Sequence, residues 1–183
     1  MRYSKIHKLD VSNGEGVGVA LFVQGCHFQC KNCFNSETWD FNGGKEWTLS
    51  IEQRFLELID RPYITRVSIL GGEPLADENV QTIFLLSQKI KTRFPDKAIW
   101  LYTGYTFENI FCKSIFDLLD NHQSQIYEYR NKILKDKYCD VLVDGQYIDE
   151  LKDISLKFRG SSNQRVINVK KSLEENQVVL YIK

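Results

Sequence analysis

The sequence predicts an α/β protein built as a partial, open (βα) barrel in a single domain. Short apolar segments alternate with segments whose apolar residues recur at helical spacing, which is typical of right-handed βαβ units around a parallel sheet. The chain has 183 residues, whereas a closed eight-stranded barrel takes about 250. A barrel that begins but does not close therefore fits both the pattern and the length.

Four short apolar runs are expected to be the strands of this sheet. Residues 17–23 have the length and β-branched content of a buried strand. The runs at residues 66–70, 98–102 and 141–143 each end at a turn that contains glycine, namely Gly71-Gly72, Thr103-Gly104 and Asp144-Gly145.

Helices are expected between and after these strands. Ser50 and Gln53 have the spacing of a capping box, so the first helix should begin at Ser50. The second should run from Val80 to Phe94, because Pro95 restricts the residue before it. Two further helices are expected at residues 107–119 and 126–134.

The alternation stops after Phe158. We therefore expect one domain over residues 1–183, with a C-terminal extension that begins at about residue 159. Within the extension, residues 165–169 and 178–182 are expected to pair as a hairpin.

Composition excludes several classes of protein. Lys and Arg (24) balance Asp and Glu (24), so no overall field would draw the chain to nucleic acid or to an anionic membrane. The longest apolar run, residues 19–23, is far shorter than the ~18 residues of a membrane-spanning helix. No apolar run follows the basic residues at the N-terminus, so we expect no signal peptide and a cytoplasmic protein.

Three of the five cysteines are spaced as C-x3-C-x2-C. An odd number of cysteines without a secretion signal argues against a disulfide framework. On a helix these three would share one face and could belong to a core, but no other apolar residue continues that stripe. A metal or cluster site is the favoured interpretation, with the thiols of Cys26, Cys30 and Cys33 as ligands.

The number of ligands indicates which kind of site this is. A structural zinc site needs four ligands, usually two pairs, and no second C-x2-C occurs. His27 is adjacent to Cys26, which makes it awkward as a fourth ligand. Three thiolates suit three corners of one [4Fe–4S] cluster and leave one iron open for chemistry. Cys112 and Cys139 are expected to be free thiols.

The glycine-rich segments have different interpretations. Gly14, Gly16 and Gly18 precede a strand, whereas a dinucleotide-binding fingerprint must follow one, so that function is rejected. Gly71-Gly72 follows a strand and leads into a helix. Paired glycines there allow the backbone to approach a ligand closely.

Six segments in order carry a resemblance to a known family: VSNGEGVG, LFVQGC-x3-C-x2-CFN-x2-TWD, ILGGEPL, WLYTGYT, VLVDGQY and FRGSSNQR. The chain resembles the radical S-adenosylmethionine (SAM) family over about residues 10–169. Within it, the set is most similar to the glycyl-radical activases that serve anaerobic ribonucleoside-triphosphate reductases.

The resemblance implies a division of roles among the site residues. Cys26, Cys30 and Cys33 would hold the [4Fe–4S] cluster, and SAM would chelate its open iron. The backbone around Asn32, Cys33 and Phe34 would meet the adenosyl group. Gly72 would meet the methionyl amino group. Many members of the family carry an aromatic residue where this chain has Asn32, and here Phe34 follows the last cysteine instead.

The resemblance also implies the reaction and its partners. The reduced cluster would cleave SAM, and the resulting radical would remove a hydrogen from a backbone glycine of the large anaerobic ribonucleoside-triphosphate reductase. An electron donor such as flavodoxin or ferredoxin would reduce the cluster, and no general acid or base is needed. Three alternatives remain at this point: an activase of the pyruvate formate-lyase type, a small-molecule radical SAM enzyme, or a non-catalytic iron–sulfur or zinc protein.

Overall fold

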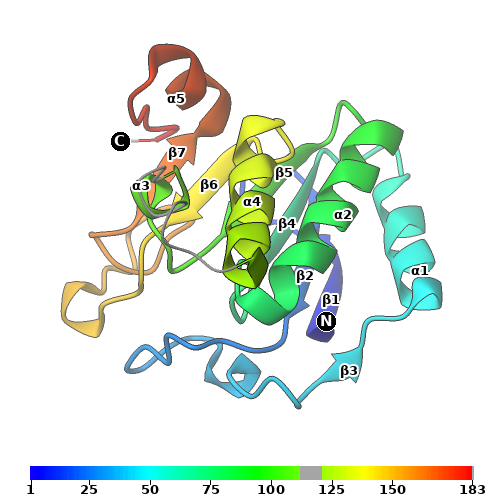
Figure 1. The fold of residues 1–183 in the computed structure, drawn as a ribbon, viewed down its shortest axis with the longest axis horizontal. Coiled ribbons are helices and arrows are strands. Elements are labelled where there is room, and N and C mark those ends of the chain that lie inside the picture. Colours follow the sequence, from blue (N-terminus) through cyan, green and yellow to red (C-terminus); the bar gives the residue numbers. More distant parts are fainter. Residues whose placement is uncertain (112–120, 183) are drawn as a thin grey trace.

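A mixed sheet forms the centre of the molecule in the computed structural model, which describes residues 1–111 and 121–182 (Figure 1). The order of its seven described strands is β3-β1-β2-β4-β5-β6-β7. Strands β2, β4, β5 and β6 are parallel neighbours, while β1, β3 and β7 join antiparallel at the two sides. Their bounds are β1 Arg2–Asp10, β2 Gly18–Val23, β3 Lys45–Glu46, β4 Arg66–Gly71, β5 Ala98–Tyr102, β6 Val141–Asp144 and β7 Arg165–Asn168.

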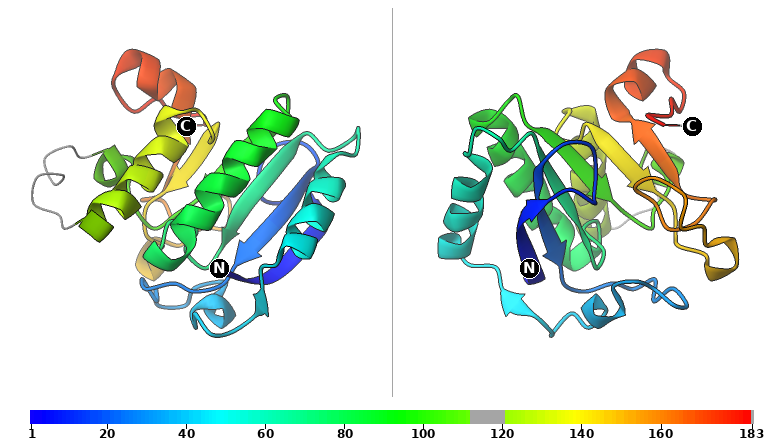
Figure 2. Two further views of the ribbon diagram at one scale, coloured as in Figure 1. Left: turned by 45° about the vertical axis from the view of Figure 1, so that its right-hand side comes forward. Right: turned by 180° about the vertical axis from the view of Figure 1, so that it is seen from behind.

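The main helices cover one face of this sheet (Figures 1 and 2). Strand order advances in one direction from β2 to β6, and right-handed crossovers then keep the connecting helices on the same side. None of the helices in the described residues is both long and apolar enough to cross a membrane. The helices are α1 Leu49–Ile59, α2 Asp77–Arg93, α3 Phe107–Phe111, α4 Asn121–Lys135 and α5 Val169–Glu175.

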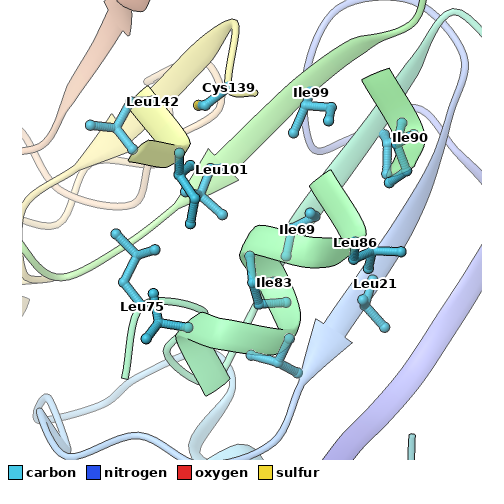
Figure 3. Packing of buried hydrophobic residues seen from close by; sticks show 14 of the residues in the cluster. Leu21, Ile69, Leu75, Ile83, Leu86, Ile90, Ile99, Leu101, Cys139 and Leu142 are labelled. Carbon is cyan, nitrogen blue, oxygen red and sulfur yellow. The ribbon is translucent and has the colours of Figure 1, made fainter. Parts of the chain in front are cut away.

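The main hydrophobic core lies between the sheet and these helices (Figure 3). Alternate strand residues point toward the helices because side chains of a strand alternate between its two faces. Leu21, Ile69 and Leu101 enter the core from three neighbouring strands, and Ile83 and Leu86 meet them from α2. All five are almost fully buried.

Most of the predicted elements are confirmed, and the α/β class with them. The four predicted strands correspond to β2, β4, β5 and β6 within one residue at each end. The capping box at Ser50 is wrong: α1 begins at Leu49, and the Thr48 hydroxyl accepts the N–H of Ile51. Of the helix predicted at residues 107–119, α3 accounts for the first part, and residues 112–119 lie outside the described residues.

The two ends of the chain contribute strands that the sequence analysis did not predict in this form. Strand β1 pairs with β2 and was missed. The predicted C-terminal pairing is confirmed in a shorter form: an antiparallel bridge joins Ile167 to Leu180, and the N–H groups of Asn168 and Tyr181 donate to Val179 and Val166. Helix α5 lies between the two paired segments, directly after β7. The tail beyond residue 159 also adds β7 to the edge of the sheet beside β6.

A buried ion pair lies on the sheet face opposite the helices. The guanidinium of Arg66 on β4 donates to the carboxylate of Asp10 at 2.7 Å, and both side chains are at most 3% exposed. Arg66 also donates to Ser68 and to the backbone of Glu15, while Ser68 donates to the carbonyl of Asn13. These bonds fold the segment 11–17 across this face near the amino ends of the parallel strands.

Replacing Arg66 by Met is expected to destabilise the fold by about 3–5 kcal/mol, because it leaves the Asp10 carboxylate buried without a cation. Urea unfolding measures the loss. The control is Glu37→Gln, which breaks the exposed pair with Lys5 and should cost under about 1 kcal/mol. Equal losses in the two variants would contradict this role of the buried pair.

Candidate functional site

The three clustered cysteines lie on a loop, residues 24–35, that follows β2; we call it the cysteine loop. Its first residues are fixed by backbone bonds, since the N–H of Gly25 donates to Thr38 and that of Cys26 to Trp39. Gln29 and Asn32 adopt positive φ angles of 46° and 55°, which turn the loop back on itself.

The cysteine loop borders a cavity of about 470 Å³ at the carboxyl ends of the parallel strands. Segments that follow β4, β5 and β6 complete its walls, as expected for a sheet of this class. All of the predicted site residues except Asn32 line this cavity: Cys26, Cys30, Cys33, Phe34 and Gly72. The side chain of Asn32 instead donates to a carboxylate oxygen of Asp149 at 2.7 Å.

The cysteine thiols are free and partly exposed. Burial raises the pKa of the Cys26 thiol, and hydrogen bonds from the backbone of Phe28 and Gln29 oppose that rise. The backbone N–H of Asn35 donates to the sulfur of Cys33 at 3.4 Å. Backbone donors directed at cysteine sulfur are one of the features that stabilise iron–sulfur clusters.

The chemistry of the donors can be compared with that of a cluster site. Cys26, Cys30 and Cys33 bring three sulfur donors to one cavity, and cysteine thiolates are the usual ligands of iron–sulfur clusters. Among the described residues, no group of three or more His, Cys, Asp or Glu side chains is close enough to hold a single metal ion. The sulfur-only donor set is compatible with an iron–sulfur cluster.

Gly72 contacts the cysteine loop directly. Its N–H donates to the carbonyl of Val23, and the next N–H, from Glu73, donates to the carbonyl of Gly25 at 2.7 Å. A Cβ atom on Gly72 would lie 2.4 Å from that same Gly25 carbonyl oxygen. The glycine is therefore required by the backbone of the cysteine loop.

Glu73 is a buried carboxylate in the cavity wall; the ILGGEPL segment includes it, but the sequence analysis assigned it no role. It accepts hydrogen bonds from the N–H of Leu75, the hydroxyl of Thr103 and the N–H of Gly104, each at 2.8 Å. These bonds tie the end of β4 to the end of β5. Burial raises the pKa of Glu73 to about 7, although its hydrogen bonds and Arg130 oppose the rise.

A family model described as a 4Fe-4S single cluster domain matches residues 12–167 of this chain. An anaerobic ribonucleoside-triphosphate reductase-activating protein from Vibrio cholerae is 37% identical over 166 residues, which are 90% of this chain and 96% of the relative. The chain belongs to the family of anaerobic ribonucleoside-triphosphate reductase-activating proteins. Its relative from Escherichia coli K12 is 37% identical over 91% of this chain and 97% of its own. The relative from Enterobacteria phage T4 is 36% identical over 91% and 93%.

In this member of the activating-protein family, residues 146–160 lie beside the cysteine loop (Figures 1 and 2). Besides the bond from Asn32 to Asp149, Lys31 pairs with Glu150 at 3.1 Å. The rings of Phe34 and Tyr147 meet edge to face, with centroids 5.5 Å apart. The VLVDGQY motif includes Tyr147, but no motif or spacing in the sequence points to Asp149 or Glu150.

Of the other two cysteines, the structure describes Cys139, which is separate from this site. Cys139 is a buried free thiol in the main core, 1% exposed, and burial raises its pKa. Cys112 lies outside the described residues.

Glu73 makes the stability of the metal-free chain depend on pH. Its pKa is about 7 in the fold and near 4.5 when exposed, so the folded chain binds an extra proton between these values. The free energy of unfolding should therefore fall by about 3 kcal/mol as the pH rises from 4.5 through 7, and level off above. Urea unfolding of Glu73→Gln should lack this contribution to the slope.

The matched control for this experiment is Glu46→Gln, a change of an exposed carboxylate on β3. Its stability profile should run parallel to that of the wild type. If the Glu73→Gln profile were also parallel to the wild type, the assignment of the pH dependence to Glu73 would be wrong.

Proposed function

We propose that this chain activates an anaerobic ribonucleoside-triphosphate reductase by generating its glycyl radical, as a radical SAM enzyme. The observation that carries the proposal is the meeting of Cys26, Cys30 and Cys33 in one cavity at the strand ends, in a chain similar to activating proteins over 90% of its length. We assign these three thiols as the ligands of one [4Fe–4S] cluster. Three ligands leave one iron of a cubane cluster for SAM.

When bound and reduced, the cluster would supply the electron that cleaves SAM. The radical released by this cleavage would remove the hydrogen atom from the glycine. The residues of this chain bind the cluster and SAM, orient them, and exclude water from the cavity. The cavity of about 470 Å³ is within the usual range for a small-molecule site. Glu73 accepts three hydrogen bonds within the cavity wall, so we assign it a structural role. The proposed reaction needs no general base.

The open sheet is consistent with the partial barrel of radical SAM proteins. All crossovers between β2 and β6 place their helices on one face (Figure 2). The opposite face therefore remains for the cavity, whose deeper wall includes Phe22, Leu70 and Tyr102. We propose that this face is the concave side of an incomplete barrel, open to a protein substrate.

One aromatic residue, Phe34, is a candidate for contact with the adenosyl group. Asn32 is held by Asp149, while Phe34 lines the cavity and is 62% exposed. Phe34 already contacts Tyr147 at an edge, which leaves ring surface for a second partner. We propose that Phe34 and the backbone of Cys33 meet the adenosyl group, while the backbone of Gly72 meets the methionyl amino group.

The remaining assignments follow from this function. The physiological reductant would be a one-electron donor such as flavodoxin or ferredoxin, acting in the cytoplasm. No overall charge favours a nucleic acid or a membrane as a partner.

Anaerobic reconstitution should give one oxygen-labile [4Fe–4S] cluster per chain. Alanine at Cys26, Cys30 or Cys33 should reduce SAM cleavage to background, because each thiolate binds a different iron. The matched control is Cys139→Ala, which removes a thiol from the core and should leave cleavage intact. Iron and sulfide analysis with release of 5′-deoxyadenosine measures both results. One zinc or two irons per wild-type chain would refute this assignment.

Gly72→Ala should impair both the cluster and SAM binding, because the added Cβ meets the Gly25 carbonyl in the cysteine loop. We expect at least about a tenfold loss of SAM affinity, measured by anaerobic calorimetry, together with lower iron content. In the control Ser50→Ala, an exposed position on α1, iron content and SAM affinity should match those of the wild type. Normal iron content and SAM affinity in folded Gly72→Ala would contradict the proposed role of this contact.

A further inference from the structure

Exposed apolar side chains gather beside the mouth of the cavity. Phe34 is 62% exposed, Ile148 39%, Leu151 42% and Ile154 90%. We call these four residues the apolar rim. Three belong to the segment 146–160 and the fourth to the cysteine loop, which lie together in Figures 1 and 2. A cluster of exposed apolar side chains marks an interaction site more often than a single exposed apolar residue does.

Several charged groups beside the rim already have a hydrogen-bond or ion-pair partner within the chain. Lys31 binds Glu150 at 3.1 Å, and the side chain of Asn32 donates to Asp149 at 2.7 Å. Asp153 accepts from both the N–H and the hydroxyl of Ser155. A protein–protein interface usually has an apolar centre and a polar rim. The four apolar residues and the paired polar groups around them have this arrangement.

The rim is continuous with the cavity. Phe34 and Ile154 line the cavity as well as the surface. Lys152 lies 5.2 Å from the centre of the Phe34 ring, and Tyr147 meets the same ring at its edge. A macromolecule that reaches into the cavity from this side must therefore cross the rim.

We propose that the apolar rim is the docking surface for the part of the reductase that carries the reacting glycine. This inference rests on the proposed function, because a backbone glycine must approach the group bound in the cavity. The occupant is an apolar surface of the reductase next to that glycine, with its backbone extended into the cavity. Specific protein interfaces bury about 1,200–2,000 Å² in total, so the rim would form the centre of a larger contact.

The test compares binding and chemistry in the cluster-loaded protein. Ile148→Ser/Leu151→Ser changes two rim residues outside the cavity lining, and Ile154→Ser changes the most exposed one. Each should weaken binding to the purified reductase by about tenfold or more, measured by anaerobic surface plasmon resonance. For the double variant, SAM cleavage by dithionite without reductase should equal that of the wild type, while glycyl-radical formation falls.

The matched control is Leu49→Ser, since Leu49 is 84% exposed and begins α1, on the other side of the molecule from the segment 146–160 (Figure 1). It should bind the reductase as the wild type does. Wild-type binding by the rim variants, or an equal loss in Leu49→Ser, would overturn the proposal. So would unchanged reductase binding together with loss of reduction by flavodoxin, which would assign the rim to the electron donor.

The experiments distinguish failure of the proposed function from failure of the docking surface. If the wild-type protein binds the reductase but cleaves no SAM, the proposed function fails, while the binding assay still tests the rim. If SAM is cleaved and the rim variants bind normally, the function stands and the docking surface is wrong.

Discussion

The pairing of β2 with β4 continues beyond the ends of both strands, and the rest of the site depends on this continuation. The N–H of Gly72 donates to Val23 and that of Glu73 to Gly25, so the turn after β4 holds the first residues of the cysteine loop. Gly72 lacks the Cβ that would collide with the Gly25 carbonyl. Because the loop carries all three clustered cysteines, these backbone bonds to the sheet help to position the thiols.

Buried polar groups then stabilise this arrangement at both ends of the parallel strands. At their carboxyl ends, Glu73 ties the turn after β4 to Thr103 and Gly104 after β5. At their amino ends, Arg66 and Asp10 bind the segment 11–17 across the sheet face opposite the helices. The helices on the other face supply most of the apolar burial.

The sequence was sufficient where local pattern determines structure. Apolar runs ending in glycine placed the four parallel strands, and strand polarity then brought the cysteines and Gly72 to one edge. Strand β1 was missed because Lys5, His7 and Lys8 make it look polar, although β2 supplies its pairing. Helix α5 was missed because it is only seven residues long and is rich in charged residues. Glu73 and Asp149 owe their roles to partners distant in the chain, which no local pattern reveals.

On the proposed function, this chain directs the removal of one hydrogen from a glycine of the reductase. The direct measurement uses reductase whose glycine residues carry deuterium at the α carbon, incubated anaerobically with SAM, a reductant and the cluster-loaded protein. Mass spectrometry of the released 5′-deoxyadenosine should find one deuterium, and electron paramagnetic resonance should find a glycyl radical on the reductase. Unlabelled 5′-deoxyadenosine without a glycyl signal would contradict the account.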